Sequence, residues 1–223
     1  MRLRPKSFWT PRYIRDRLAL AHHQHREPDA PWWPAEAAAR LDDLVRPSDT
    51  CLEWGSGRST AWLSARTARV VSVEHDPEWC ERVRSQLDGA GRAVRLLSTD
   101  PVQRPETSPY VRVVDEFADG ELDVCIVDGE HRGKCALAAI PKLAPGGLIV
   151  IDDVHWFLDH PTHAPHSRRG LGPADVDWGR FAEVVAEWRR IWITDGVTDT
   201  AIWITPSGRG ETCQAATPTG APS

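Results

Sequence analysis

Short apolar runs alternate with segments of helical periodicity along most of this chain. The runs predict strands at 50–54, 69–73, 93–97, 122–127 and 148–151. The last two are apolar almost throughout, as strands covered on both faces are. Between the runs, apolar residues recur every three or four positions; segment 76–89 does so between an Asp-Pro start and a glycine. This alternation predicts an α/β fold built on a parallel sheet.

The pattern changes toward the end of the chain. Residues 191–194 and 200–205 alternate apolar with polar positions and are joined by an Asp-Gly turn, so they predict an antiparallel hairpin. A helix capped by Asp177 should precede the hairpin. A weak strand signal at 111–114 lies in a polar, proline-rich segment before the fourth run.

The first residues predict helices outside the sheet. Thr10 and Pro11 indicate a helix start, and a second helix should cover 35–45. Trp32 and Trp33 lie between prolines. We expect their side chains to take part in ordinary packing; the alternative is that they form an aromatic wall of a substrate pocket. The expected organisation is an N-terminal helical extension over 1–47, a sheet domain over 48–206 and a disordered, low-complexity tail over 207–223.

The composition narrows the classes of function. No apolar run among the 223 residues reaches the ~18 residues of a membrane helix, and the first residues lack the apolar core of a signal peptide. With a net charge of −5, we expect a cytoplasmic protein that binds neither membranes nor, in general, nucleic acid. The odd number of cysteines without a C-x-x-C pair predicts buried thiols. Whether the protein forms a homo-oligomer stays open.

Glycines and acidic residues gather around the end of the first strand. Glu53 lies near the end of that strand, and the turn that follows has a glycine on each side of Ser56. Ser59 or Thr60 can cap the next helix. Glu74 ends the second strand, where an acidic residue ~20 positions beyond such glycines commonly binds ribose hydroxyls. A dinucleotide fingerprint would have a third glycine and no acid before the turn, whereas a carboxylate there suits a cationic ligand.

With an acidic residue followed by G-x-G, the chain resembles the class I methyltransferases that use S-adenosylmethionine (SAM), over about residues 49–206. The resemblance implies a doubly wound, mostly parallel seven-stranded sheet of order 3-2-1-4-5-7-6 with strand 7 antiparallel. It implies that Glu53 interacts with the cationic amino-acid end of SAM, that backbone N–H groups at 55–58 hold its carboxylate, and that Glu74 binds the ribose. The cofactor-binding residues expected in all are Glu53, Gly55, Ser56, Gly57, Ser59, Thr60, Glu74, His75, Asp100 (near the adenine) and Asp128.

A second group of polar residues follows the fourth and fifth strands. Asp128 and His131 lie in the sequence Asp-Gly-Glu-His, and Asp152, Asp153 and His155 follow the fifth run. Adjacent parallel strands would bring the carboxylates together, and three carboxylates in an enclosed site need a counter-charge, for which Mg²⁺ is the expected ion. Helix caps or hydrogen bonds on the cofactor side are the alternative roles for Asp128 and Asp152.

This group resembles the metal-dependent O-methyltransferases of macrolide sugars and, more distantly, of catechols, which have Asp-Asn where this chain has Asp152-Asp153. The resemblance implies a metal site of Asp128, Asp152 and Asp153, and catalysis by His131 as general base beside Asp128, with His155 as a competitor for that role. We therefore expect a SAM-dependent methyltransferase that acts on a hydroxyl, or an amine, of a small molecule. An NAD(P)-dependent oxidoreductase and a non-catalytic SAM-binding protein are the alternatives.

Overall fold

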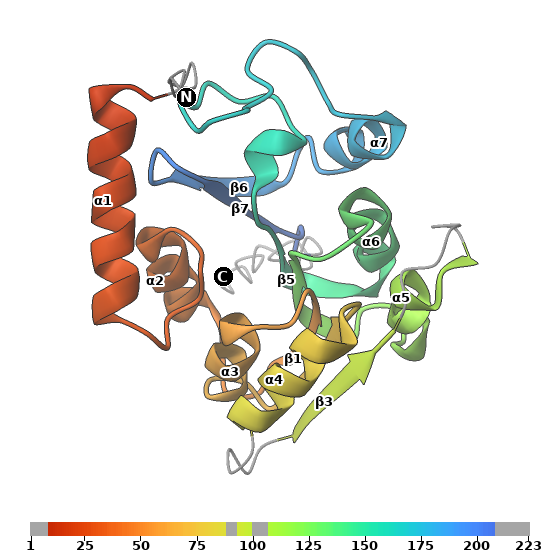
Figure 1. Cartoon of the computed structure of the whole chain (residues 1–223). Coiled ribbons are helices and arrows are strands. Elements are labelled where there is room, and N and C mark those ends of the chain that lie inside the picture. Colours follow the sequence, from red (N-terminus) through yellow and green to blue (C-terminus); the bar gives the residue numbers. More distant parts are fainter. Residues whose placement is uncertain (1–8, 88–92, 100–106, 208–223) are drawn as a thin grey trace, which may run out of the picture.

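The computed structural model describes residues 9–87, 93–99 and 107–207. Its centre is a seven-stranded sheet of order β3-β2-β1-β4-β5-β7-β6 (Figure 1). The strands are β1 Thr50–Trp54, β2 Arg69–Glu74, β3 Ala93–Ser98, β4 Leu122–Val127, β5 Leu143–Ile151, β6 Arg189–Thr194 and β7 Asp199–Ile204. Neighbours among β1 to β5 pair in parallel, and β7 is antiparallel to both β5 and β6. The predicted fold class, strand order and terminal hairpin are confirmed.

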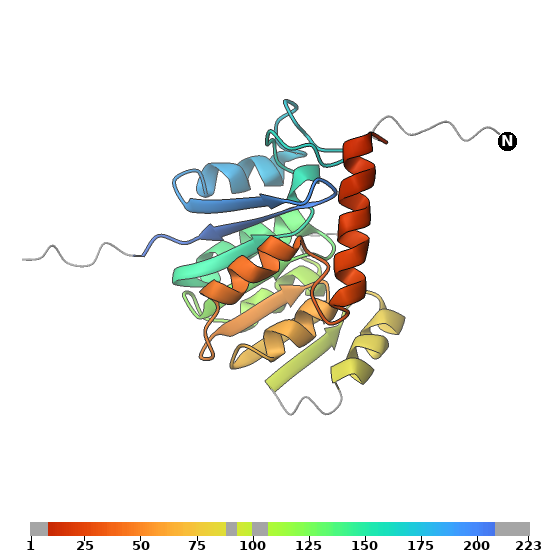
Figure 2. The same cartoon turned by 90° about the vertical axis from the view of Figure 1, so that its left-hand side faces the viewer.

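Helices cover both faces of this sheet (Figures 1 and 2). The α-helices are α1 Pro11–Arg26, α2 Ala35–Leu44, α3 Arg58–Ser64, α4 Pro77–Leu87, α5 Pro109–Arg112, α6 Arg132–Ala139 and α7 Val176–Val184. Short 3₁₀ helices are η2 Val113–Glu116, η3 Ile140–Lys142 and η4 Val154–Trp156. Within the described ranges, none of the helices combines the length and the apolar character that a membrane crossing needs.

Successive residues of the inner strands point to opposite faces and divide the core in two. Cys51 and Val70 pack with residues of α2 and α3 on one face. Leu52 and Val71 pack with residues of α5, α6 and α7 on the other face. All four side chains are at most 1% exposed, which is why these strands lack the polar alternation of a half-exposed sheet.

The weak strand expected at 111–114 is wrong. These residues belong to α5 and η2. Ser108 is the N-cap residue and Pro109 the first helical residue, an arrangement that favours a helix start whatever the β-branched residues that follow. Val111 and its neighbours are buried against the sheet from this helix, so tertiary packing overrides their strand propensity.

Two predicted helix caps are also displaced. The N-cap of α3 is Gly57, and the Thr60 hydroxyl accepts a hydrogen bond from the Gly57 N–H at 2.9 Å instead of capping a later start. The N-cap of α7 is Asp175, whose carboxylate accepts from the N–H groups of Asp177 and Trp178 at 2.9 and 3.0 Å. In both cases another residue type that is common at N-caps, glycine or aspartate, lies within three positions of the predicted one, and the chain path decides between them.

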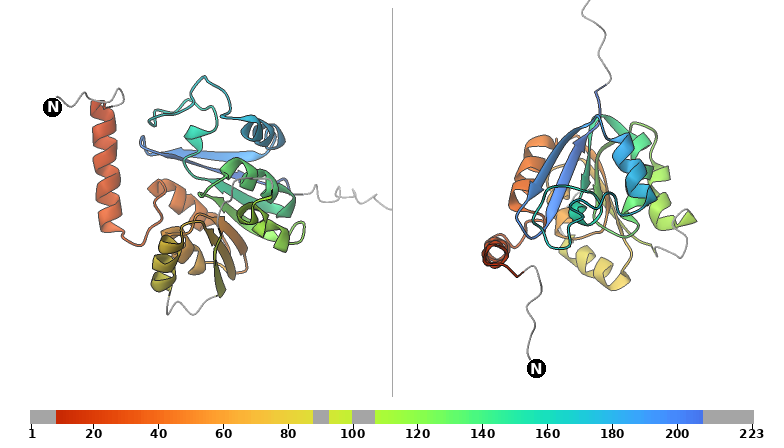
Figure 3. Two further views of the ribbon diagram at one scale, coloured as in Figure 1. Left: turned by 45° about the vertical axis from the view of Figure 1, so that its right-hand side comes forward. Right: turned by 90° about the horizontal axis from the view of Figure 1, so that it is seen from above.

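Helix α1 stands apart from this body, beside the edge at which the parallel strands end (Figures 2 and 3). Thr10 caps it as predicted and accepts from the Tyr13 N–H at 3.1 Å. Leu20 is its buried residue, and Asp16 lies against Gly196 in the turn between β6 and β7. Of the tail predicted to be disordered, residues 208–223 lie outside the described part of the chain.

Candidate functional site

A tight turn joins β1 to α3 and lies against the end of β4. Gly55 has a φ of +93°, and a Cβ on it would come within 2.8 Å of backbone atoms of Asp128 and Gly129. A Cβ on Gly129 would overlap the hydroxyl of Tyr110 and lie 2.9 Å from the Gly55 nitrogen. The ends of β1 and β4 therefore touch backbone to backbone, and only glycine fits at both positions.

Glu53 fixes this turn from behind. Its Oε2 accepts hydrogen bonds from the hydroxyls of Thr60 at 2.5 Å and Ser72 at 2.6 Å. Its Oε1 is buried and has no hydrogen-bond partner among the described residues. Complete burial raises the pKa of Glu53 to about 7, against the lowering effect of hydrogen bonds from Ser59, Ser72 and Thr60. The Glu53 side chain thus links α3 and β2 to the end of β1. The burial of its carboxyl group is unfavourable for the ionised form.

Glu74 is the last residue of β2, and backbone N–H groups hold its carboxylate. Oε2 accepts from the Ser56 N–H at 3.0 Å, and Oε1 accepts from the N–H groups of His75 and Asp76, both at 2.9 Å. The Nδ1 atom of His75 lies 3.0 Å from the same Oε1. Since a carboxylate has about four acceptor sites, Oε2 retains capacity for one more donor.

A cavity of about 360 Å³ opens where these elements meet. The indole of Trp79 donates to the Ser56 carbonyl at 2.7 Å, and its ring lies 6.1 Å from that of Trp32. Glu74, His75 and Asp128 are on the wall. The lining residues are Trp32, Trp33, Gly55, Ser56, Gly57, Arg58, Ser59, Glu74, His75, Asp76, Trp79, Asp128 and Gly129.

Most of the expected cofactor-binding residues come together on this wall, but two do not. Glu53 and Thr60 are fully buried behind the turn and do not line the cavity. Asp100 lies outside the described residues. Trp32 does form part of an aromatic wall; Trp33, only 2% exposed, lines the cavity and also packs edge-on against Trp62, so the packing and wall roles coexist.

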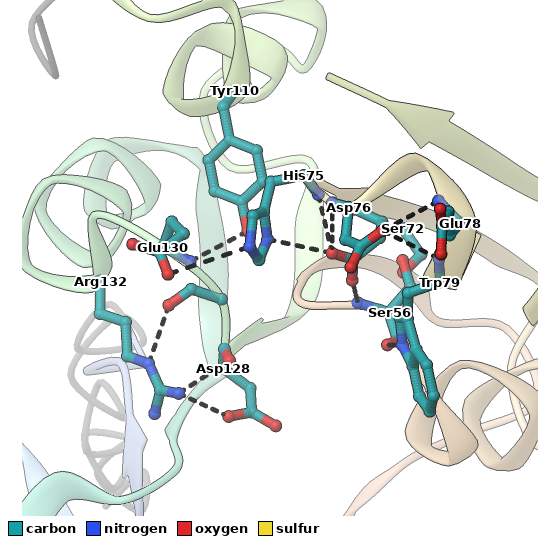
Figure 4. Close-up of polar contacts among 12 residues, drawn as sticks. Ser56, Ser72, His75, Asp76, Glu78, Trp79, Tyr110, Asp128, Glu130 and Arg132 are labelled. Carbon is teal, nitrogen blue, oxygen red and sulfur yellow. Dashed lines mark hydrogen bonds and ion pairs between the residues drawn. The ribbon is translucent and has the colours of Figure 1, made fainter. Parts of the chain in front are cut away.

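Beside the cavity, Arg132 contacts Asp128 at the carboxyl end of β4 (Figure 4). It also contacts the chain just beyond β5. Its guanidinium donates to the carbonyls of Asp128, Gly129 and Asp152 at 2.7–2.9 Å. Its Nη2 lies 3.0 Å from the Asp128 carboxylate. Burial raises the pKa of Asp128 to about 6, and the nearby Arg132 charge opposes that rise.

The three expected metal ligands do not converge. The carboxylate of Asp152 accepts from Thr200 Oγ1, and that of Asp153 from Thr198 Oγ1, both at 2.5 Å. In the described part of the chain, no three His, Cys, Asp or Glu side chains are grouped so that they could hold a metal ion. The counter-charge that these acids need comes instead from Arg132, and the hydroxyls of Thr198 and Thr200 are the hydrogen-bond donors. As arranged here, the residues do not fit a metal.

The two histidines considered as bases lie in different surroundings. His131 is the N-cap residue of α6 and has the left-handed backbone conformation, with a φ of 51°. It therefore precedes the helix, and it does not lie one helical turn past Asp128 as the Asp-Gly-Glu-His spacing suggested. It lines a second cavity, of about 440 Å³, which meets the first at Gly129. His155 is fully buried, accepts from the Asp199 N–H through Nδ1 at 3.2 Å and lines neither of these two cavities. Burial also lowers the pKa of His155. Because its side chain reaches neither cavity, its position does not favour the role of base.

Sequence reasoning missed four residues of this region: Arg58, Asp76, Trp79 and Arg132. The Asp-Pro start of the segment 76–89 predicts Asp76 only as a helix cap. Asp76 has that role at α4, because its carboxylate accepts from the Glu78 and Trp79 N–H groups. Arg58 follows the glycine turn directly, a position that could have signalled a contact with a ligand. Nothing local distinguishes Trp79 or Arg132 from other amphipathic helix residues.

The comparisons with known proteins agree with this geometry. Residues 52–154 match a family model described as Methyltransferase domain. A protein-L-isoaspartate O-methyltransferase of Salinibacter ruber is 31% identical over 146 residues, which are 61% of this chain and 58% of the relative. The match thus spans little more than half the length of that curated relative.

Two solved structures share the fold. The O-methyltransferase TomG from Streptomyces achromogenes, solved in complex with SAM, gives a TM-score of 0.53 at 21% identity and covers 88% of this chain and 90% of its own. A methyltransferase from Geobacter sulfurreducens gives a TM-score of 0.51 at 16% identity and covers 91% of each chain.

Proposed function

We propose that this chain transfers the methyl group of SAM to a hydroxyl, or alternatively an amine, of a small molecule. Two findings support the proposal: residues 52–154 match a family model described as Methyltransferase domain, and the sheet has the strand order that the resemblance to class I methyltransferases implied. One observation carries the proposal: the cavity at the ends of β1, β2 and β4 combines the glycine turn with carboxylates. Ligands of open α/β sheets bind at this edge. The similarity to TomG, an O-methyltransferase, favours an oxygen acceptor.

The residues of the first cavity fit SAM in size and charge. A volume of about 360 Å³ lies within the ~300–1,000 Å³ of ligand pockets. The open acceptor site on Glu74 Oε2 suits a ribose hydroxyl, and Asp128 offers a carboxylate to a cationic group. Trp32 and Trp79 supply an apolar wall. Glu53 would act on the ligand through the turn that it holds.

The second cavity is placed to hold the methyl acceptor. It is lined by aromatic residues of η4 and α7, among them Trp156 and Trp178, and by His131. SAM, when bound, supplies an electrophilic methyl group on a sulfonium sulfur. His131 would remove the proton of the acceptor hydroxyl, so that the oxygen attacks as a nucleophile. Arg132, between the two cavities, would hold the ends of β4 and β5 in position.

A second candidate acceptor is the side-chain carboxylate of an isoaspartyl residue. The relative from Salinibacter ruber favours it, because that protein is a protein-L-isoaspartate O-methyltransferase. A carboxylate is already a nucleophile at neutral pH and needs no base. The two candidates therefore differ in their dependence on His131.

Calorimetric titration with S-adenosylhomocysteine (SAH) and with NADH tests the cofactor. Binding of NADH without SAH would replace this proposal by the oxidoreductase alternative. Release of SAH from SAM, measured with hydroxylated metabolites, amines and an isoaspartyl peptide, then identifies the acceptor class. SAH binding without turnover on any acceptor would favour a SAM-binding protein without catalytic activity.

His131→Ala tests the base. On a hydroxyl acceptor we expect turnover to fall ~10²–10⁴-fold with unchanged SAH affinity, and on an isoaspartyl peptide we expect little change. Equal loss on both acceptors would contradict the role of His131 as a base.

A further inference from the structure

We propose that the guanidinium of Arg58 binds the carboxylate at the amino-acid end of SAM, so that this cavity selects nucleosides that carry an anionic end. The inference rests on the proposed function and names a residue and a selectivity for the same site. It offers a side-chain donor in place of the backbone N–H groups of the turn that we expected to hold this carboxylate.

Three of the four N–H groups expected to hold the carboxylate are already used within the protein. Gly55 N donates to the end of β2 at 2.9 Å, Ser56 N to Glu74 at 3.0 Å, and Gly57 N to Thr60 at 2.9 Å. A ligand carboxylate could engage one of these three donors only by displacing an internal acceptor. These three N–H groups are therefore poorly placed to hold the anionic end of the ligand, and a charged donor beside them would hold it better.

Arg58 is the cation on that wall. Among the lining residues, Glu74, Asp76 and Asp128 are acidic, and Arg58 is the one Arg or Lys that the structure describes there. SAM carries two positive groups, the sulfonium and the ammonium, and one carboxylate. The acidic residues suit the first two. The planar guanidinium matches the carboxylate with two parallel N–H donors.

Arg58 also has an unused donor. Its Nη1 is buried and has no hydrogen-bond partner among the described residues. Its guanidinium carbon lies 5.3 Å from the centre of the Trp32 ring, which places the charge at the cavity wall. A buried donor without a partner is unfavourable, and a bound carboxylate would satisfy it.

Arg66, eight positions further on, provides a matched comparison. It too lies over an indole, that of Trp62, at 4.1 Å. Its Nε, however, donates to Asp42 at 2.5 Å and its Nη1 to the Trp62 carbonyl at 3.2 Å, and it does not line the first cavity. Of these two arginines that lie over tryptophans, Arg58 is the one with an unpaired buried donor.

The test is calorimetric titration of the full chain with two thioether nucleosides: SAH, and 5′-methylthioadenosine, which lacks the amino-acid end. For Arg58→Gln we expect SAH to bind roughly 10- to 100-fold more weakly, the loss typical of a charged hydrogen bond, with unchanged affinity for 5′-methylthioadenosine. Arg58→Lys should restore part of the SAH affinity, because it keeps the charge and loses the fork. Arg66→Gln should bind both ligands as the wild type does.

A change in the ligand gives a second measurement that does not depend on how the variant folds. The wild type should bind the carboxamide of SAH more weakly than SAH, and Arg58→Gln should bind the two equally, which closes a double-mutant cycle. Equal affinity of the wild type for SAH and its carboxamide would overturn the inference. So would an equal loss of SAH and 5′-methylthioadenosine binding in Arg58→Gln, since that would show an effect on the shape of the turn. If the wild type bound no SAH at all, the proposed function itself would fail.

Discussion

Replacing Glu53 by glutamine should remove a pH-dependent penalty that the folded chain carries beneath the glycine turn. The carboxyl group is fully buried, and its pKa is raised from 4.5 to about 7. Glutamine has nearly the same shape, and its carbonyl oxygen can still accept from Thr60 and Ser72, as Glu53 Oε2 does. The substitution therefore removes the titration and keeps most of the packing.

The sign follows from the protons bound in each state. Between pH 4.5 and about 7 the folded chain retains the Glu53 proton more often than the unfolded chain does, so the free energy of unfolding falls as the pH rises through this window. At 1.36 kcal/mol per pKa unit, the shift amounts to about 3 kcal/mol once both states are ionised. Below pH 4.5 both states are protonated and the penalty vanishes.

Urea unfolding of the wild type and of Glu53→Gln at a series of pH values from 4 to 8 measures this effect. Relative to the variant, the wild type should lose about 3 kcal/mol of unfolding free energy across the series. Asp128 and Asp152 also have raised pKa values because of burial, but they titrate in both proteins, so most of their contribution cancels in the difference. A difference that stays constant with pH would refute the reasoning, because it would show that Glu53 has the same pKa in the folded and the unfolded chain.

Three further predictions concern the site. Glu74→Ala should weaken SAH binding by ~1.5–3 kcal/mol, measured by calorimetry; unchanged affinity would remove Glu74 from the site. Gly55→Ala should destabilise the fold by at least about 1–3 kcal/mol, because Gly55 has a positive φ and touches the end of β4. Gly57→Ala should leave the thermal midpoint unchanged, because a Cβ there would meet nothing within 4 Å. Equal midpoints for the two variants would contradict the argument. Turnover should persist in the presence of a chelator, because Arg132 already supplies the counter-charge to Asp128; loss of activity that Mg²⁺ restores would show that the acidic residues rearrange around a metal.

Local sequence patterns were sufficient to predict the strands and the turn on which this site is built. The apolar runs predicted the inner strands because β1, β2, β4 and the end of β5 are covered on both faces. The glycines around Ser56 predicted the turn because no residue with a Cβ fits at Gly55, where β1 meets β4. The position of Glu74 followed from the same logic, since the last residue of a parallel strand lies at the ligand edge of the sheet.

Contacts between distant segments decided the rest. Asp152 and Asp153 are paired with Thr200 and Thr198 because β7 lies beside β5, and no local pattern shows which oxygens of an acidic pair this neighbour will occupy. The sequence favoured His131 as the base but left His155 as a competitor for that role.

The αL conformation at the start of α6 puts His131 on a cavity wall, while packing against β7 buries His155. The sequence by itself thus determined the sheet, the turn and the edge at which a ligand can bind, because these depend on periodicity and on backbone conformations available to few residues. Only the tertiary structure decided which charged side chains are satisfied internally and which, like Arg58, keep a buried donor without a partner among the described residues.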